Sequence, residues 1–143
     1  MQRRRASLAA LPLAVSLLAS CGDTTSDEYV IENDPGSVEH VEGSDIGRVT
    51  LTDGAAGRLG VRTTPVTRVG QRLAVPDRAV FADPDGAWWV YTNPAPGVYV
   101  RHEIRLARHR QGLTLLSSGP GAGTEVVTVG VAELYGIEAE VGH

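Results

Sequence analysis

Residues 98–106 carry an alternating pattern that limits what this chain can fold into. Every second side chain from Val98 to Leu106 is apolar except His102, and the side chains between them are Tyr99 and charged residues. A period of two is typical of a half-buried β-strand, since a helix repeats every 3.6 residues. We therefore expect a strand here. We expect His102 to be a core residue and not a metal ligand, because a metal site needs converging partners.

Turn residues divide the neighbouring sequence into further strands. Residues 87–92 are rich in aromatic and β-branched side chains, and the loop 93–97 joins them to the strand above as a hairpin. The other expected strands cover residues 72–81, 113–117 and 125–131. Pro76 indicates an edge strand or a bulge. These features predict a mainly β domain, a small barrel or roll.

One short helix is expected in this β domain. Thr52 or Asp53 can cap a turn that contains Ala55 and Leu59, and Gly60 is suited to end it. No internal repeat or heptad pattern is present, so the sequence predicts no coiled coil.

The N-terminal 20 residues have the layout of a secretory signal. Three arginines precede the apolar stretch Ala6–Ala19, which is too short for a membrane span of about 20 apolar residues. The stretch ends at Leu18-Ala19-Ser20-Cys21, with the only cysteine of the chain. An ordinary cleaved signal would leave this thiol unpaired in an exported protein, and that would need a separate explanation.

This tetrad resembles the bacterial lipobox of prolipoprotein leaders. The resemblance covers residues 1–21 and implies that Cys21 receives a diacylglycerol, becomes the first residue of the mature chain and holds it at the cell membrane. Stable anchoring needs more than one acyl chain, because each buried methylene contributes only about 0.8 kcal/mol. The expected localisation is extracytoplasmic, on the periplasmic side or the outer surface.

Charge divides the remaining sequence into two parts. Residues 22–47 hold eight acids and no arginine, whereas residues 48–143 hold ten arginines and nine acids. So acidic a stretch has little apolar surface to bury and is predicted to be an unstructured spacer, either functional or merely solvated. The expected organisation is a signal peptide (1–20), a lipidated N-terminus with an acidic tether (21–47) and one β domain (48–143).

Several short segments, taken in order, resemble the membrane-proximal domain of periplasmic adaptor subunits, the membrane fusion proteins of tripartite efflux pumps. They are Val75-Pro76-Asp77-Arg78-Ala79-Val80, Gly86-Ala87-Trp88-Trp89-Val90-Tyr91, Gly97-Val98-Tyr99-Val100-Arg101 and residues 118–130. Residues 49–66 look like the N-terminal strand, helix and strand of heavy-metal-type adaptors. The resemblance covers about residues 48–135. It implies an efflux role through contact with a transporter or a full-length adaptor.

The sequence departs from that family in the middle and at two positions. An adaptor inserts a lipoyl-like domain, a helical hairpin and a β-barrel where Val66 is here followed almost at once by Leu73. Pro120 stands where the family commonly has leucine, and Thr124 stands where an acid is usual. The resemblance therefore implies the part of an adaptor that packs beside the transporter, without the parts that span the envelope.

Few residues suggest chemistry. Trp88 and Trp89 should point to opposite faces of a strand, so one of them is expected in the core and the other, Trp88, at a partner contact. Arg101 and Arg105 share a face that is either a partner contact or merely solvated. We predict no catalytic residues, no metal and no cofactor beyond the lipid at Cys21.

Other candidate ligands have simpler interpretations. His40 lies among acids in a mobile arm that lacks a preformed site, and His109 is expected in a loop between two arginines. Asp83-Pro84-Asp85-Gly86 begins like a calcium loop but lacks the later ligands, so a turn is expected.

The sequence thus predicts a non-enzymatic, lipid-anchored accessory protein of an efflux transporter, with no nucleic-acid partner. The alternative is a lipoprotein that binds a small molecule or metal and delivers it to a transporter. A cavity with converging polar groups would favour that alternative. A solid core with an exposed aromatic or arginine patch would favour the contact protein.

Overall fold

A computed structural model describes residues 36–141 of the chain. The predicted signal peptide, the lipid site Cys21 and the first part of the predicted tether lie outside the described residues. Within residues 36–141, no helix is long and apolar enough to cross a membrane.

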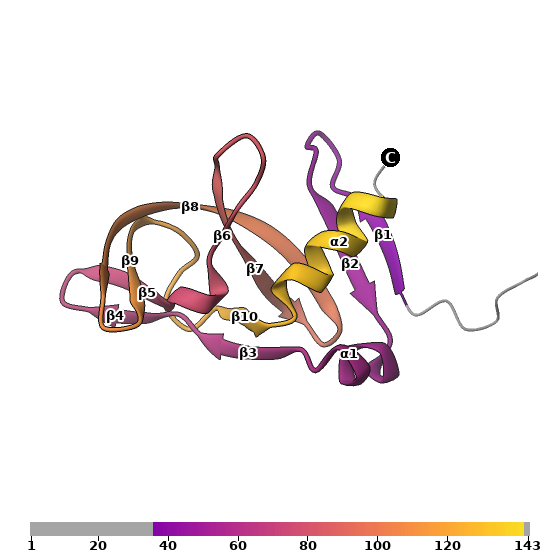
Figure 1. The fold of residues 1–143 in the computed structure, drawn as a ribbon, viewed down its shortest axis with the longest axis horizontal. Helices are drawn as coiled ribbons and strands as arrows, with labels where there is room; N and C mark the ends of the chain where they lie inside the picture. Colours follow the sequence, from indigo (N-terminus) through magenta and orange to yellow (C-terminus); the bar gives the residue numbers. More distant parts are fainter. Residues whose placement is uncertain (1–35, 142–143) are drawn as a thin grey trace, which may run out of the picture. The chain divides into compact units, whose positions relative to one another are not determined.

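The described part is mainly β, as the sequence predicted, and is built on a curled ten-stranded sheet (Figure 1). The main strand order is β3-β10-β7-β8-β9-β5-β4, all pairs being antiparallel, while β2 joins β1 to β8 and β6 pairs with β7. The strands are β1 Gly36–His40, β2 Gly47–Leu51, β3 Arg62–Pro65, β4 Thr67–Val69, β5 Arg72–Pro76, β6 Phe81–Ala82, β7 Trp88–Ala95, β8 Val98–Arg110, β9 Leu113–Ser118 and β10 Glu125–Val129.

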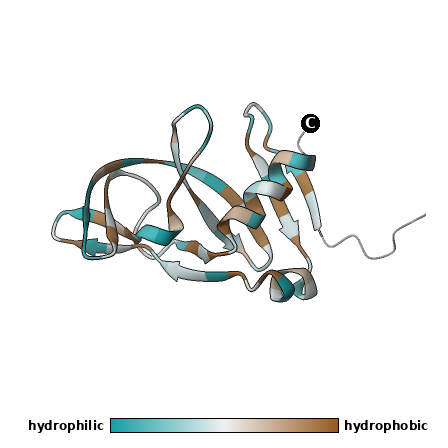
Figure 2. Ribbon diagram, viewed as in Figure 1, coloured by the Kyte–Doolittle hydropathy of each residue, from teal (hydrophilic) through white to brown (hydrophobic). Residues whose placement is uncertain are grey.

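The centre of the sheet is buried on both faces. Neighbouring residues of one strand point to opposite faces, and this separates Tyr91 from Val90 in β7 and Val127 from Val126 in β10. The first core, on the helix side, consists of Val49, Leu51, Ala55, Tyr91, Tyr99, Val127 and Leu134. The second core consists of Val66, Val75, Ala79, Val90, Ile104, Leu116 and Val126. Figure 2 shows the corresponding alternation of hydrophobic and hydrophilic residues along the strands.

Strand β8 serves both cores, and this corrects the expectation of one apolar face. Tyr99 is buried in the first core and Ile104 in the second, because these two residues alternate onto opposite faces. The register of β8 against β9 shifts on both sides of Leu106, as the strand passes from one half of the sheet to the other. His102, expected in the core, is exposed, because no strand pairs with β8 on its second edge at that position.

Helix α1, Asp53–Leu59, follows the prediction. The Thr52 hydroxyl accepts a hydrogen bond from Ala55 N at 3.2 Å, and Gly60 ends the helix in the left-handed conformation at φ 65°. The expectation of a single helix was wrong. A second α-helix, α2 Val131–Val141, packs over the first core, and a short 3-10 turn, η1, covers Asp77–Ala79.

The β domain begins earlier than the predicted boundary at residue 48. Strand β1 lies in the expected acidic tether and pairs with β2 along its whole length, from Gly36 opposite Leu51 to His40 opposite Gly47. Val38 packs against the first core, while Glu39 is exposed. The acidic composition is compatible with folding here because the charged residues lie on the solvent side.

Two expected segments have different limits. The strand expected over residues 72–81 divides into β5, η1 and β6, and Pro76 ends β5 beyond its last pair with β4. The hairpin loop between β7 and β8 is shorter than predicted, because β7 continues to Ala95 through a register shift. Gly97 closes the turn at φ 73°, and a Cβ on this residue would lie 2.5 Å from the Leu51 carbonyl oxygen.

Candidate functional site

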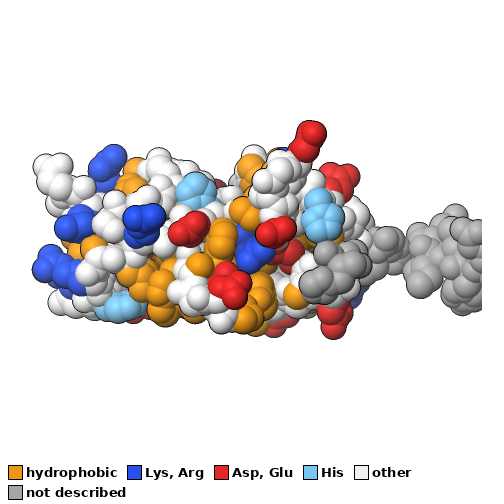
Figure 3. All heavy atoms as spheres, turned by 90° about the horizontal axis from the view of Figure 1, so that it is seen from above, with side chains coloured by type: hydrophobic (Ala, Val, Ile, Leu, Met, Phe, Trp, Pro, Cys, Tyr) orange, Lys and Arg blue, Asp and Glu red, His pale blue; other side chains and the backbone are white. Residues whose placement is uncertain are grey.

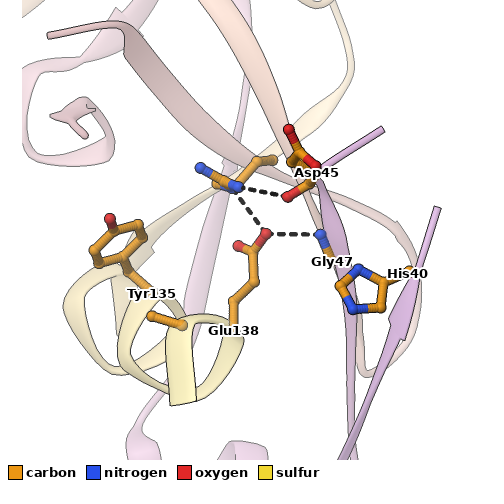
Figure 4. Close-up of a pocket in the computed structure, with 7 residues that line it drawn as sticks. His40, Asp45, Gly47, Tyr135 and Glu138 are labelled. Carbon is orange, nitrogen blue, oxygen red and sulfur yellow. Dashed lines mark hydrogen bonds and ion pairs between the residues drawn. The ribbon is translucent and has the colours of Figure 1, made fainter. Parts of the chain in front are cut away.

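A buried carboxylate joins helix α2 to the sheet. Glu138 is 6% exposed; its Oε1 accepts hydrogen bonds from Gly47 N at 2.7 Å and Arg101 Nε at 2.8 Å. Its Oε2 accepts one from the Tyr91 hydroxyl at 2.5 Å. Figure 4 shows Glu138 reaching from α2 toward Gly47 of β2. Three donors from β2, β7 and β8 therefore converge on one side chain.

Arg101 extends this network away from the helix. Its Nη2 donates to the Asp45 carbonyl at 3.2 Å, and its guanidinium lies 4.8 Å from the centroid of the Trp89 ring. The indole Nε1 of Trp89 in turn donates to Asp83 at 2.8 Å. Cation–π contacts of this kind are stronger when the cation is desolvated, and only 13% of the Arg101 side chain is exposed.

Two groups in the network have shifted pKa values. Burial, reinforced by the hydrogen bond to Glu138, raises the pKa of the Tyr91 phenol. Partial burial acts to raise the pKa of Asp83, but the hydrogen bonds from Trp89 and the Ala87 amide outweigh it and leave that pKa lowered. Tyr91 is therefore a neutral donor and Asp83 a charged acceptor near neutral pH.

A cavity of about 170 Å³ lies beside Glu138, between α2 and strands β1, β2 and β8. Its lining consists of His40, Asp45, Gly47, Arg101, Tyr135, Glu138 and Ala139. Three of the four lone-pair sites of the Glu138 carboxylate accept protein donors, two on Oε1 and one on Oε2, so little of it is left for a ligand. The arrangement holds α2 in place and leaves a small polar hollow at the surface.

A second polar cluster links η1 to β8 and β9. The buried Thr114 hydroxyl donates to Asp77 at 2.6 Å, and Nδ1 of the exposed His109 lies 3.2 Å from the same carboxylate oxygen. The hydrogen bond from Thr114, followed by the one from His109, lowers the pKa of Asp77. The expected loop at His109 is instead the end of β8. Thr114 is fully buried, so its hydroxyl cannot reach a substrate as a nucleophile.

The predicted contact residues have different environments. Trp88 is 41% exposed, whereas Trp89 is partly buried beneath Arg101, so the two indoles differ as expected. Arg105 is exposed. Arg101 was predicted at a partner contact with Arg105, but the structure places it in the internal ion pair with Glu138.

The role of Glu138 was not predicted, because the sequence pattern indicated no helix after residue 131. A signal was present, since Leu134 and Glu138 are four residues apart and share one helix face. An acid in line with a core leucine points to a buried, paired carboxylate. Its partners, Gly47 and Arg101, are 91 and 37 residues away, so no local pattern connects them.

The other candidate ligands are accounted for within the fold. The segment Asp83–Gly86 is a turn, as predicted, with Gly86 N bonded to Asp83 O at 3.0 Å and Gly86 at φ 84°. His40 lies at the end of β1 beside the cavity. In the described residues 36–141, no three His, Cys, Asp or Glu side chains are placed to share a metal ion.

No protein-family model matches the chain, and no curated protein matches it. Any functional assignment must therefore be argued from the residues, the fold and the resemblance of the short segments.

Proposed function

We propose that this chain is a lipid-anchored extracytoplasmic accessory protein that contacts a membrane transporter, in the manner of the membrane-proximal domain of an efflux adaptor. Cys21 would supply the anchor. The domain from Gly36 onward would supply the contact surface.

One observation carries this proposal: the adaptor-like segments, which are dispersed in the sequence, pair with one another in a single sheet. Residues 49–51 lie in β2, which pairs with β8 at residues 98–100. Residues 88–91 lie in β7, which pairs with both β8 and β10. Residues 59–66 include β3, which pairs with β10. Segments that belong to one domain in a family must be able to form one domain here, and these do.

The chain also forms a continuous sheet at the position where an adaptor inserts its further domains. Adaptors insert further domains between the counterparts of Val66 and Leu73. Here β4 and β5 form a tight hairpin across that position, with Val69 opposite Arg72. Gly70 takes φ 61° in the turn, a conformation that glycine adopts without strain. The sheet therefore continues through the place where an adaptor would leave the domain.

A surface for protein contact is present next to this sheet. Trp88 begins β7 with 41% of its surface exposed, although a large aromatic side chain usually gains from burial. Aromatic and arginine side chains are enriched among residues that dominate binding energy at interfaces. Trp88 and Arg105 remain the residues that we assign to the contact.

Cargo binding has less support. The cavity beside Glu138 is small, and its two strongest charges, those of Arg101 and Glu138, neutralise each other. Ligand pockets are usually about 300 Å³ or larger and mostly apolar. A cargo site would need a ligand that engages His40 and Asp45 at the rim.

Site-specific photo-crosslinking in the native bacterium tests the proposed contact. The chain has no lysine, so amine-reactive reagents do not suit it; a photoreactive amino acid replaces Trp88 in one strain and the exposed Arg58 of α1 in a control strain. We expect a transporter or adaptor subunit to be captured from position 88 and not from position 58. Recovery of no transport component from either position would sink the proposal.

A further inference from the structure

The charged residues of the described domain are strongly segregated. Residues 67–76 and 105–118 form β4, β5, the second half of β8 and β9, and they contain five arginines without an aspartate or glutamate. These arginines are Arg68, Arg72, Arg105, Arg108 and Arg110. The other residues between 36 and 141 hold five arginines and twelve acids. Figure 3 shows basic side chains gathered at one end of the domain and acidic ones over the rest of the visible face.

Three of these arginines lie on the outer face of the sheet. Residues paired across antiparallel strands share a face. One row across β5, β9 and β8 consists of Leu73, Leu116 and Leu106, and it belongs to the second core. The adjacent row consists of Ala74, Leu115 and Arg108 and points the other way; Ala74 and Leu115 are buried, whereas Arg108 is exposed. Arg72 and Arg110 lie two residues along their strands from Ala74 and Arg108, so they share this outer face.

The outer arginine face, defined as Arg72, Arg108 and Arg110, has unused binding capacity. All three side chains are exposed, and none forms an ion pair or side-chain hydrogen bond with another described residue. A guanidinium presents five donors in a planar fork that matches the oxygens of a phosphate. Three such groups on β5 and β8, the two strands that flank β9, form an anion-binding surface, and the nearby Asp77 carboxylate is already bound by Thr114 and His109.

We infer that the outer arginine face binds the anionic headgroups of a phospholipid membrane. Each arginine near an anionic bilayer contributes to binding over a range of about 10 Å, so the surface must be held close to the membrane. The inference rests on the proposed function only for the anchor at Cys21 that would provide this nearness. The acidic remainder of the domain would be repelled by the same bilayer, and this would orient the sheet end toward it.

The chain's own acidic segment is a weaker candidate for this surface. Five acids lie between residues 22 and 35, which would match the arginines in charge. However, that segment joins the domain at β1, at the end of the domain opposite the β4–β5 and β8–β9 hairpins (Figure 1). The segment would have to fold back along the domain to reach the arginines, whereas the anchor at Cys21 needs only to keep the domain near the membrane.

Vesicle co-sedimentation tests the inference with the chain from residue 22 onward, which retains every described residue and carries no lipid. The vesicles are phosphatidylcholine alone, or equal parts of phosphatidylcholine and phosphatidylglycerol. We expect binding to the anionic vesicles only, and loss of this binding at high salt. The variant Arg72→Glu/Arg108→Glu/Arg110→Glu should bind roughly 100-fold more weakly, because it loses three arginine contacts with the bilayer.

The matched control is Arg48→Glu/Arg58→Glu/Arg62→Glu, which reverses the same number of exposed arginines outside the arginine-rich segments. It has the same net charge and should bind within about threefold of the parent, since charges farther than a Debye length are screened. Thermal unfolding is compared for all chains. If the first variant is unfolded, the corresponding Arg→Gln variant replaces it.

Three results would overturn the inference. One is no binding of the parent chain to anionic vesicles. Another is equal loss of binding in both triple variants. The third is binding that emerges only after the five acids before residue 36 are neutralised, which would assign the arginine face to that segment. The assay contains no transporter, so its failure is distinct from failure of the crosslinking experiment.

Discussion

At the scale of single residues, Glu138 is the most consequential side chain in the described domain. Its buried carboxylate is stabilised by hydrogen bonds from three donors on three different strands. Removing one partner of a buried ion pair leaves the other charged and desolvated, and this is more damaging than the pair itself is stabilising. The same hydrogen bonds fix the position of α2, so loss of Glu138 affects the packing of the helix as well as the hydrogen bonds themselves.

Glu138→Ala should lower the free energy of unfolding by roughly 3–5 kcal/mol, because Arg101, the Tyr91 hydroxyl and the Gly47 amide lose their acceptor. Urea unfolding monitored by tryptophan fluorescence measures this change in the free energy of unfolding. Glu140→Ala, an exposed acid two residues later on α2, is the control and should change stability by less than about 0.5 kcal/mol. Equal effects of the two substitutions would contradict the assigned role of Glu138.

Asp77 should make stability depend on pH in acid. The hydrogen bond from Thr114, and then that from His109, lowers the folded pKa of this carboxyl below its ordinary value of 3.8. A depressed pKa contributes stability above pH 3.8 that is lost as the pH falls through the folded pKa. In thermal melts, the difference between the parent and Asp77→Asn should therefore be present at neutral pH and shrink below about pH 4. A difference that stayed constant below about pH 4 would contradict this role of Asp77.

At the scale of elements, local signals predicted several parts well. The Thr52 cap and the Gly60 stop of α1 depend only on neighbouring residues, and the hairpin of β7 and β8 depends on a turn between two strand-forming runs. Helix α2 was missed because its short, weakly patterned sequence contains Gly136 and is stabilised by packing and by Glu138. Strand β1 was missed because acidic composition outweighed the apolar Val38.

The β7–β8 turn offers a test of close backbone contact. Gly97→Ala should destabilise the domain by about 2 kcal/mol or more, since a Cβ would lie 2.5 Å from the Leu51 carbonyl in addition to the strain of φ 73°. Gly112→Ala is the matched control, with φ 79° and no atom within 4 Å of its Cβ. It should cost only about 1 kcal/mol. Equal unfolding midpoints for the two variants would contradict the predicted contact.

At the scale of the whole molecule, the ordered domain includes residues that composition had assigned to the tether. The β1–β2 pairing and the Gly47–Glu138 hydrogen bond both depend on residues before Arg48. The acidic stretch therefore has two parts: residues 36–47 belong to the sheet, and residues 22–35 lie outside the described domain.

A pair of truncations tests this domain start. A chain that begins at Gly36 should unfold with a cooperative transition close to that of the chain from residue 22. A chain that begins at Arg48 should be strongly destabilised, because it loses β1, the Val38 contact with the first core and one donor to Glu138. Circular dichroism on heating measures both. Equal melting temperatures would show that β1 is dispensable.

The proposed anchor is tested by cell fractionation. Cys21→Ser should move the protein from the membrane fraction to the extracytoplasmic fraction, because no acyl chain can then attach through the thiol. Ser20→Ala, which keeps a small residue before the cysteine, should remain with the membrane. Retention of Cys21→Ser at the membrane would refute the lipid anchor, and the arginine face would then need to account for the binding.

Local sequence patterns were sufficient for the β character of the domain, for most of its strands and for α1, because alternation, caps and turns act between close neighbours. They were insufficient for the side on which each part of β8 is buried, for α2 and for the role of Arg101. Those features depend on contacts such as Arg101 with Glu138, between residues far apart in sequence. Burial and charge pairing arise when distant elements meet, so Arg101 was expected at the surface and lies in an internal ion pair.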